Sequence, residues 1–123
     1  MVRRRILVVD DDPDSREALS EVLRLFGHDV LQAADGEMAI DVAGRNRPEV
    51  ILLDLGLPDL DGYEVARRLR AAPGGEHAFL IGLTGYSRDE TFERMQASGF
   101  DEHVLKPCEP EHLEQIIATA TRR

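Results

Sequence analysis

Three consecutive acidic residues follow directly on an apolar run near the start of the chain, in the segment LVVDDD at residues 7–12. Two carboxylates about 4 Å apart repel each other by roughly 4 kcal/mol at an effective dielectric constant near 20. Such a cluster is typical either of a turn that enters solvent or of a site that holds a cation. Asp12 is the exception, because the proline that follows it favours a helix-capping role.

The basic residues are almost all of one type, because the chain has fourteen arginines and a single lysine, Lys106. An ammonium group is a compact point charge, whereas a guanidinium group is a wide planar fork. Lys106 is therefore a candidate for a role that arginine does not fill. The count alone leaves open the alternative that one lysine remains by chance.

These residues lie at the ends of apolar segments that alternate with amphipathic ones. Short apolar or β-branched runs predict strands, and apolar residues at helical spacing between Asp, Gly and Pro boundaries predict helices. The predicted strands are 5–9, 29–32, 49–53, 79–83 and 102–105, and the predicted helices are 13–26, 36–45, 62–70, 87–97 and 110–120. This alternation predicts a doubly wound α/β fold, with helices on both faces of a parallel sheet.

Polar side chains stand at the carboxyl ends of four of the five predicted strands. Asp10 and Asp11 follow the first strand, and Asp54 follows the third. Thr84 follows the fourth strand and Lys106 follows the fifth. In such sheets, ligands bind outside the carboxyl ends of the strands, where the strand order reverses. A single acid after a strand is usually a turn residue, but four strands that end in complementary groups predict one shared site.

The segments ILVVDDD, ILLDLGLPDLDG, LTGYS and VLKP, in this order, resemble the receiver domain of two-component response regulators. The resemblance covers about residues 5–120. It implies a flavodoxin-like (βα)5 fold with strand order 2-1-3-4-5, in one receiver domain over 1–123. It also implies that the domain takes a phosphoryl group from the phosphohistidine of a histidine kinase or histidine phosphotransfer protein. Such a domain is not an enzyme for other substrates, and it catalyses only its own phosphorylation and dephosphorylation.

The resemblance assigns roles to individual residues. Asp54 corresponds to the phosphoacceptor. Asp10, Asp11 and the backbone carbonyl of Gly56 would bind Mg²⁺ together with Asp54, and Lys106 would pair with the new phosphoryl group. Mg²⁺ takes oxygen ligands in octahedral geometry, and phosphoryl transfer is catalysed mainly by positioning and charge neutralisation. The acids and the lysine fit both requirements.

A conformational switch is implied as well. Thr84 would bond the phosphoryl group, and a ring on the fifth strand would then turn inward. That position is His103 here, where Tyr or Phe is common, and the alternative is a half-exposed strand residue without a switching role. The output surface would comprise the fourth helix, the fifth strand and the fifth helix. It would bind a downstream protein or a second copy of the domain, with Tyr86, Arg88 and Arg94 as candidate contacts.

Composition limits the partners and the location. A net charge of −9 and a pI near 4.8 argue against direct binding to nucleic acid or to anionic membranes. A single cysteine, Cys108, is typical of a reducing compartment, and the apolar run at 6–9 is too short for a signal peptide or a membrane span. We therefore expect a cytoplasmic protein. His28, His77 and His112 lack metal-ligand spacing and are predicted to be surface residues.

Two alternatives come from other functional classes. A Mg²⁺-dependent aspartyl-phosphate phosphatase of the haloacid dehalogenase type would use similar chemistry, but that family has a second Asp two residues after its nucleophile, where this chain has Gly56. A receiver-like interaction module that is never phosphorylated is the other alternative. The complete set of acids, together with Thr84 and Lys106, argues against it. The resemblance further predicts a cis peptide bond between Lys106 and Pro107.

Overall fold

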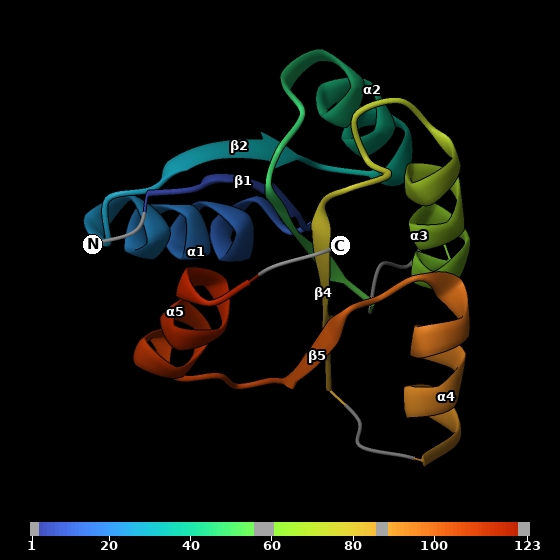
Figure 1. Ribbon diagram of the computed structural model, residues 1–123. Coiled ribbons are helices and arrows are strands. Elements are labelled where there is room, and N and C mark those ends of the chain that lie inside the picture. The colour runs from blue at the N-terminus through green and yellow to red at the C-terminus, as the bar shows by residue number, and fades with distance from the viewer. Residues whose placement is uncertain (1–2, 56–60, 86–88, 121–123) are drawn as a thin grey trace.

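Parallel strands form a single sheet with helices on both faces in the computed structural model, which describes residues 3–55, 61–85 and 89–120 (Figure 1). The strands are β1 (Arg5–Val9), β2 (Asp29–Ala33), β3 (Val50–Asp54), β4 (Phe79–Thr84) and β5 (Glu102–Leu105), and the helices are α1 (Pro13–Leu25), α2 (Gly36–Asn46), α3 (Gly62–Ala71), α4 (Asp89–Ser98) and α5 (Pro110–Ala118). The sheet order is β2-β1-β3-β4-β5, and all neighbouring strands are parallel. The predicted fold class and strand order are confirmed.

Successive residues of the central strands are buried on opposite faces of the sheet. On β1, Leu7 and Val9 belong to the core shared with α2, α3 and α4, whereas Ile6 and Val8 belong to the core shared with α1 and α5. Every residue of β3 is buried. The continuous apolar runs in the sequence therefore reflect strands that are covered on both sides, because side chains alternate between the two faces of a strand.

Aspartates begin three of the helices. The carboxylate of Asp12 accepts a hydrogen bond from the amide of Asp14 at the start of α1, where Pro13 occupies the first turn. Asp35 and Asp61 cap α2 and α3 in the same way. Each carboxylate satisfies an N–H group that has no partner within the helix. The predicted capping role of Asp12 is confirmed.

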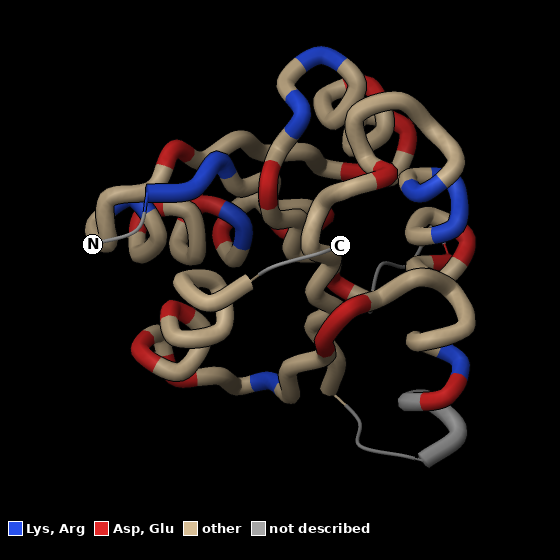
Figure 2. Tube along the Cα trace, viewed as in Figure 1, with Lys and Arg blue, Asp and Glu red and all other residues tan. Residues whose placement is uncertain are grey.

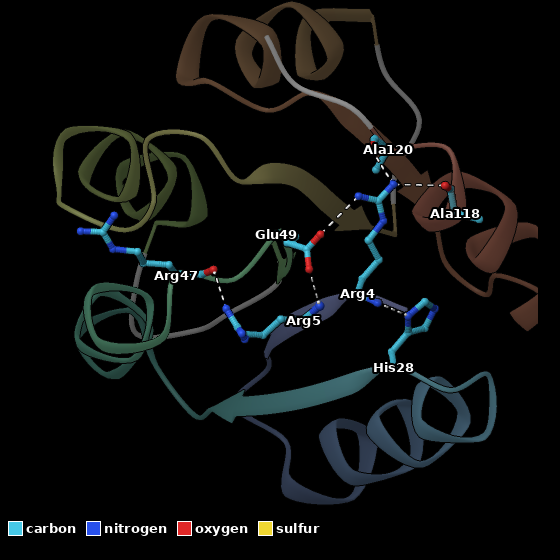
Figure 3. A network of polar contacts seen from close by, with 7 residues as sticks. All are labelled: Arg4, Arg5, His28, Arg47, Glu49, Ala118 and Ala120. Carbon is cyan, nitrogen blue, oxygen red and sulfur yellow. Dashed lines mark hydrogen bonds and ion pairs between the residues drawn. The ribbon is translucent and has the colours of Figure 1, made fainter. Parts of the chain in front are cut away.

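The start of the sheet is fastened to α2 by Arg5 (Figure 3). Its Nη1 donates to the carbonyl oxygens of Asn46, at 3.0 Å, and Arg47, at 3.5 Å. Arg47 has a left-handed backbone with φ of 47°, which ends the helix one residue beyond the predicted end at 45. A left-handed residue at this position is a common way to end a helix, although glycine is the usual choice.

Arg4 fastens the last turn of α5 to the same edge of the sheet (Figure 3). Its Nη2 donates to the carbonyl oxygens of Ala118, at 3.2 Å, and Ala120, at 2.8 Å. Its Nη1 lies 3.4 Å from Oε2 of Glu49. The last carbonyls of a helix have no partner within the helix, so Arg4 satisfies groups that the helix itself leaves open.

His28 is buried, so its predicted surface position is wrong. Its Nδ1 accepts a hydrogen bond of 2.9 Å from the amide of Arg4, and its Nε2 lies 2.7 Å from Oε1 of Glu114. Because an accepting Nδ1 carries no proton, Nε2 is the nitrogen that donates to Glu114. These partners are far from His28 in the sequence, which explains why local patterns do not indicate its burial. His77 and His112 are exposed, as predicted.

Charged residues occur along many elements of the chain (Figure 2). Figure 2 shows basic segments at the start of β1 and along α3, and acidic segments on several helices. None of the helices in the described part of the chain has the length and apolar character needed to cross a membrane.

Candidate functional site

Three carboxylates meet at the carboxyl edge of the sheet. Asp10 and Asp11 follow β1, Asp54 ends β3, and one oxygen from each lies within 4.8 Å of the others. The amide of Asp10 continues the hydrogen-bond ladder of the sheet by donating to the carbonyl of Ala33. The side-chain Oδ1 of Asp10 accepts a hydrogen bond from the amide of Asp12. The folded chain therefore brings together Asp10, Asp11 and Asp54, the three acids that the sequence predicts to share a site.

Lys106 reaches the same cluster from the end of β5. Its Nζ lies 2.8 Å from Oδ2 of Asp54. The amide of Lys106 donates to the carbonyl of Thr84, and the amide of Leu55 donates to the carbonyl of Leu83. These backbone bonds hold the ends of β3, β4 and β5 side by side, so the sheet fixes the backbone position from which Lys106 reaches Asp54.

Thr84 is buried at the end of β4. Asp54 pairs in register with Leu83, so Thr84 lies one residue beyond the partner of the acid. Thr84 in turn pairs with Leu105, the residue before Lys106. The predicted hydroxyl group therefore belongs to a strand that runs between the acid and the lysine.

The charges of this site favour a divalent cation. Asp10 and Asp54 are only 5% and 7% exposed, and buried carboxylates are costly unless a positive charge compensates them. Three carboxylates facing one ammonium group leave a surplus of negative charge. Oxygen ligands of this kind suit a hard cation such as Mg²⁺. The donor set therefore fits the predicted metal.

Some predicted site residues are less well defined by the structure. His103 lies on β5 opposite Gly82 of β4, with its side chain 31% exposed. Its role as a switch stays a prediction. Gly56, Tyr86 and Arg88 lie outside the described residues. The predicted cis bond between Lys106 and Pro107 is present.

Comparison with known proteins identifies the family to which the chain belongs. A family model described as the response regulator receiver domain matches residues 6–118. The chain belongs to the response regulator receiver domain family. It is therefore a phosphoacceptor domain of two-component signal transduction, and the phosphatase alternative is not supported.

Individual receiver proteins show how far this likeness extends. The chain is 38% identical to the DNA-binding response regulator MtrA of Mycolicibacterium smegmatis, over 99% of this chain and 52% of that protein. It thus spans about half the length of this relative. Chemotaxis protein CheY4 of Vibrio cholerae has a TM-score of 0.88 and 28% identity, covering 94% of this chain and 97% of that one.

A third receiver domain carries a metal. The receiver domain of sensor histidine kinase PA1611 from Pseudomonas aeruginosa has a TM-score of 0.83 and 33% identity, over 94% of this chain and 95% of that one. Its structure is described with a magnesium ion coordinated in the active site cleft. Receiver domains bind Mg²⁺ at an acidic site, and this receiver domain has a cluster of three carboxylates at the carboxyl ends of its strands.

The sequence patterns did not single out two side chains beside the acidic cluster. Arg16 of α1 donates to the backbone carbonyl of Asp10, and it also donates to the side chain of Gln32 on β2. A single sequence gives no signal for Arg16, because arginine is the general cation of this chain.

Proposed function

We propose that Asp54 is the residue that accepts the phosphoryl group. The observation that supports this assignment is its position: the carboxylate is almost buried, lies beside two other carboxylates, and bonds the ammonium group of Lys106. No other carboxylate in the described part of the chain combines an ion pair to lysine with membership of this cluster.

The transfer exchanges one bond for another. An oxygen of the Asp54 carboxylate forms a bond to phosphorus, while the bond between phosphorus and the histidine nitrogen of the donor breaks. The imidazole leaves with the bonding electron pair while its other ring nitrogen carries a proton, so it remains as the neutral ring of the donor protein. Lys106 lies next to the new phosphoryl group and offsets its negative charge, and the hydroxyl of Thr84 donates a hydrogen bond to it.

Asp10, Asp11 and Asp54, with the backbone carbonyl of Gly56, are the residues that would hold Mg²⁺. The bound ion supplies positive charge that lowers the repulsion between the attacking carboxylate and the phosphoryl oxygens. The protein contributes the placement of the carboxylates, which the strand ends fix before the donor arrives.

The donor in this proposal is a histidine kinase or a histidine phosphotransfer protein of the cytoplasm. The domain, taken as one unit over 1–123, catalyses its own phosphorylation and dephosphorylation and acts on no other substrate. Its net charge of −9 opposes direct contact with nucleic acid. The name of MtrA includes DNA binding, but this chain spans only about half of that protein.

The output surface in this proposal consists of α4, β5 and α5. The route to it begins at Thr84, which shares a strand pair with β5, and continues to His103 on that strand. The surface would bind a downstream protein or a second copy of the domain. Arg94 is the candidate contact on α4 that lies within the described residues.

Incubation with acetyl phosphate and Mg²⁺, followed by intact-mass analysis, tests the assignment. We expect a gain of one phosphoryl group in the wild type and no gain in Asp54→Ala. Asp41→Ala is the control, because Asp41 is an exposed acid of α2 that pairs with Arg45. A gain that persists in Asp54→Ala would move the acceptor to another residue.

A further inference from the structure

Arg16 joins the metal-site segment to the neighbouring strand. From the first turns of α1, its Nη1 donates to the backbone carbonyl oxygen of Asp10 at 2.9 Å. Its Nε donates to Oε1 of Gln32 at 3.0 Å, and Nε2 of Gln32 donates to Oε2 of Glu17 at 2.8 Å. The guanidinium group thus connects the residue that follows β1 to a side chain of β2.

We propose that Arg16 is a positioning residue for the Mg²⁺ site, acting through the peptide group between Asp10 and Asp11. This inference rests on the proposed function of the acidic cluster and adds a residue to it. Arg16 bonds the backbone carbonyl oxygen of Asp10, which belongs to the peptide group between Asp10 and Asp11. Its task is to hold that peptide group so that both carboxylates face Asp54.

The geometry of the peptide group explains how one bond can do this. The carbonyl oxygen of Asp10 and the Cα of Asp11 belong to the same planar unit. A hydrogen bond to this oxygen therefore restricts where the Asp11 side chain begins. Asp10 has further restraints, since its amide and its carboxylate are both hydrogen-bonded. Asp11 is exposed, so its placement depends more on the peptide group.

Gln32 and Glu17 hold Arg16 in this position. Because Gln32 donates through its amide nitrogen to Glu17, its amide oxygen is the atom that faces Arg16. The same hydrogen bond from Gln32 lowers the pKa of Glu17, so the acceptor of this chain of bonds stays ionised at neutral pH. Two bonds at different nitrogens then fix both the place and the tilt of the planar guanidinium group.

Electrostatics alone predicts the opposite effect of removing Arg16. A positive charge near a cation site repels Mg²⁺, so its loss should tighten Mg²⁺ binding. A positioning role predicts weaker binding, because the two carboxylates lose their alignment. Residues that orient metal ligands typically change the metal affinity by tenfold or more when they are replaced. The direction of the change therefore separates the two roles.

The experiment titrates the unphosphorylated protein with Mg²⁺ and follows the amide resonances of Asp11 and Lys106 by NMR. We expect Arg16→Met to weaken Mg²⁺ binding by about tenfold. Arg45→Met is the control for the loss of a positive charge, because Arg45 pairs with Asp41 on the exposed side of α2. Wild-type affinity, or tighter binding, in Arg16→Met would overturn the proposal.

Two further variants separate positioning from charge and from folding. Arg16→Lys keeps the charge but replaces the fork with a single ammonium group, so we expect Mg²⁺ binding between those of the wild type and Arg16→Met. Gln32→Met leaves the bond from Arg16 to Asp10 in place but removes its second bond, so we expect a loss of Mg²⁺ affinity smaller than the loss of about tenfold in Arg16→Met. Wild-type Mg²⁺ affinity in both Arg16→Lys and Gln32→Met would contradict the proposal. This test remains valid even if Arg16→Met does not fold.

The test of Arg16 can fail independently of the test of Asp54 as the phosphoacceptor. If wild-type protein gains no phosphoryl group from acetyl phosphate, the assignment of Asp54 fails, while the Mg²⁺ titrations still report on Arg16. If the wild type is phosphorylated and Arg16→Met binds Mg²⁺ as well as Arg45→Met does, the role of Arg16 fails alone.

Discussion

The ammonium group of Lys106 bonds the carboxylate of Asp54, which is also one of the proposed Mg²⁺ ligands. It bonds Oδ2 of Asp54, and its own side chain is 40% exposed, so the pair is partly screened by water. We predict that Lys106→Met binds Mg²⁺ a few times more tightly, because a competing positive charge is gone. Phosphorylation by acetyl phosphate should slow by on the order of a hundredfold, since the new phosphoryl charge loses its partner.

Mg²⁺ titration measures the predicted increase in Mg²⁺ affinity, and the rate of mass gain measures the predicted decrease in phosphorylation rate. Lys106→Arg restores the charge on a wider group. We expect its Mg²⁺ affinity to return to the weaker wild-type value, whereas its phosphorylation rate recovers only in part. Arg45→Met is the control for loss of a cation, because Arg45 pairs with Asp41 on the exposed side of α2. An unchanged phosphorylation rate in Lys106→Met would contradict the role of this lysine.

The thiol of Cys108 gives a prediction for alkaline pH. Burial, together with the nearby charge of Glu109, raises the pKa of Cys108 in the folded protein, although the amide of Leu113 opposes this shift. A raised folded pKa stabilises the fold below the unfolded thiol pKa, and this contribution is lost as pH rises through the folded value. Between pH 8 and 10 we expect the wild type to lose more unfolding free energy than Cys108→Ala.

Urea unfolding at both pH values measures this difference. The variant shares every other titrating group, so the difference between the two proteins isolates the thiol. Iodoacetamide should also modify Cys108 more slowly in the folded protein than in urea, because the thiolate is the reactive form. Equal loss of stability in both proteins would show that the thiol has the same pKa in the folded and unfolded states.

At the scale of elements, Arg4 decides how firmly α5 is held to the sheet. It bonds two carbonyls at the end of that helix and also contacts Glu49, but its Nε is buried without a partner among the described residues. We predict that Arg4→Met lowers the unfolding free energy by about 1–2 kcal/mol, because charged hydrogen bonds are lost while one buried donor is relieved. Urea unfolding measures the change.

The neighbouring arginine is the control for this prediction. Arg3 pairs with Asp29 at 2.6 Å, but both side chains are largely exposed, so Arg3→Met should lower the unfolding free energy much less than Arg4→Met does. Hydrogen exchange adds a local readout, with faster exchange expected in the last turn of α5 in Arg4→Met. Equal stability of the two variants would mean that the α5 contacts of Arg4 contribute nothing.

The elements also show which parts of the site the sequence could predict. Asp54, Thr84 and Lys106 were predictable because each follows an apolar strand, and the carboxyl ends of parallel strands share one edge of the sheet. The predicted end of α2 was one residue too early. Arg47 adopts a left-handed backbone after the helix, and no local sequence pattern indicates this. Helix boundaries of this kind depend on partners such as Arg5.

Contacts between distant side chains were out of reach. The burial of His28 depends on Arg4, which is 24 positions away, and on Glu114, which is 86 positions away. The contact of Arg16 with Gln32, which is 16 positions away, depends on how α1 packs beside β2. Periodicity indicates which face of an element is buried, but it does not indicate which polar groups meet across that face.

At the scale of the whole molecule, the two ends of the sheet have different tasks. At the amino ends of the strands, Arg4, Arg5 and Glu49 form bonds that link the sheet to α2 and α5 (Figure 3). At the carboxyl ends, three carboxylates crowd together and repel one another. Functional sites often reduce stability in this way, and the rest of the fold offsets the cost.

This arrangement predicts opposite effects of one substitution with and without metal. Asp11→Asn removes one of the repelling charges but also one Mg²⁺ ligand. Without Mg²⁺ we expect its unfolding free energy to rise by about 0.5–1 kcal/mol, because repulsion at this partly exposed position is relieved. With Mg²⁺ at ten times the wild-type dissociation constant, the wild type should gain about 1.4 kcal/mol, and the variant should gain far less.

Thermal and urea unfolding, with EDTA or with Mg²⁺, measure the crossover. Salt at matched ionic strength controls for general screening, which matters in a chain with a net charge of −9. Asp14→Asn is the matched variant, because it removes an exposed acid from the first turn of α1 without touching the cluster. If Mg²⁺ stabilises Asp11→Asn as much as the wild type, Asp11 is not a ligand, and the clustered carboxylates would need another explanation.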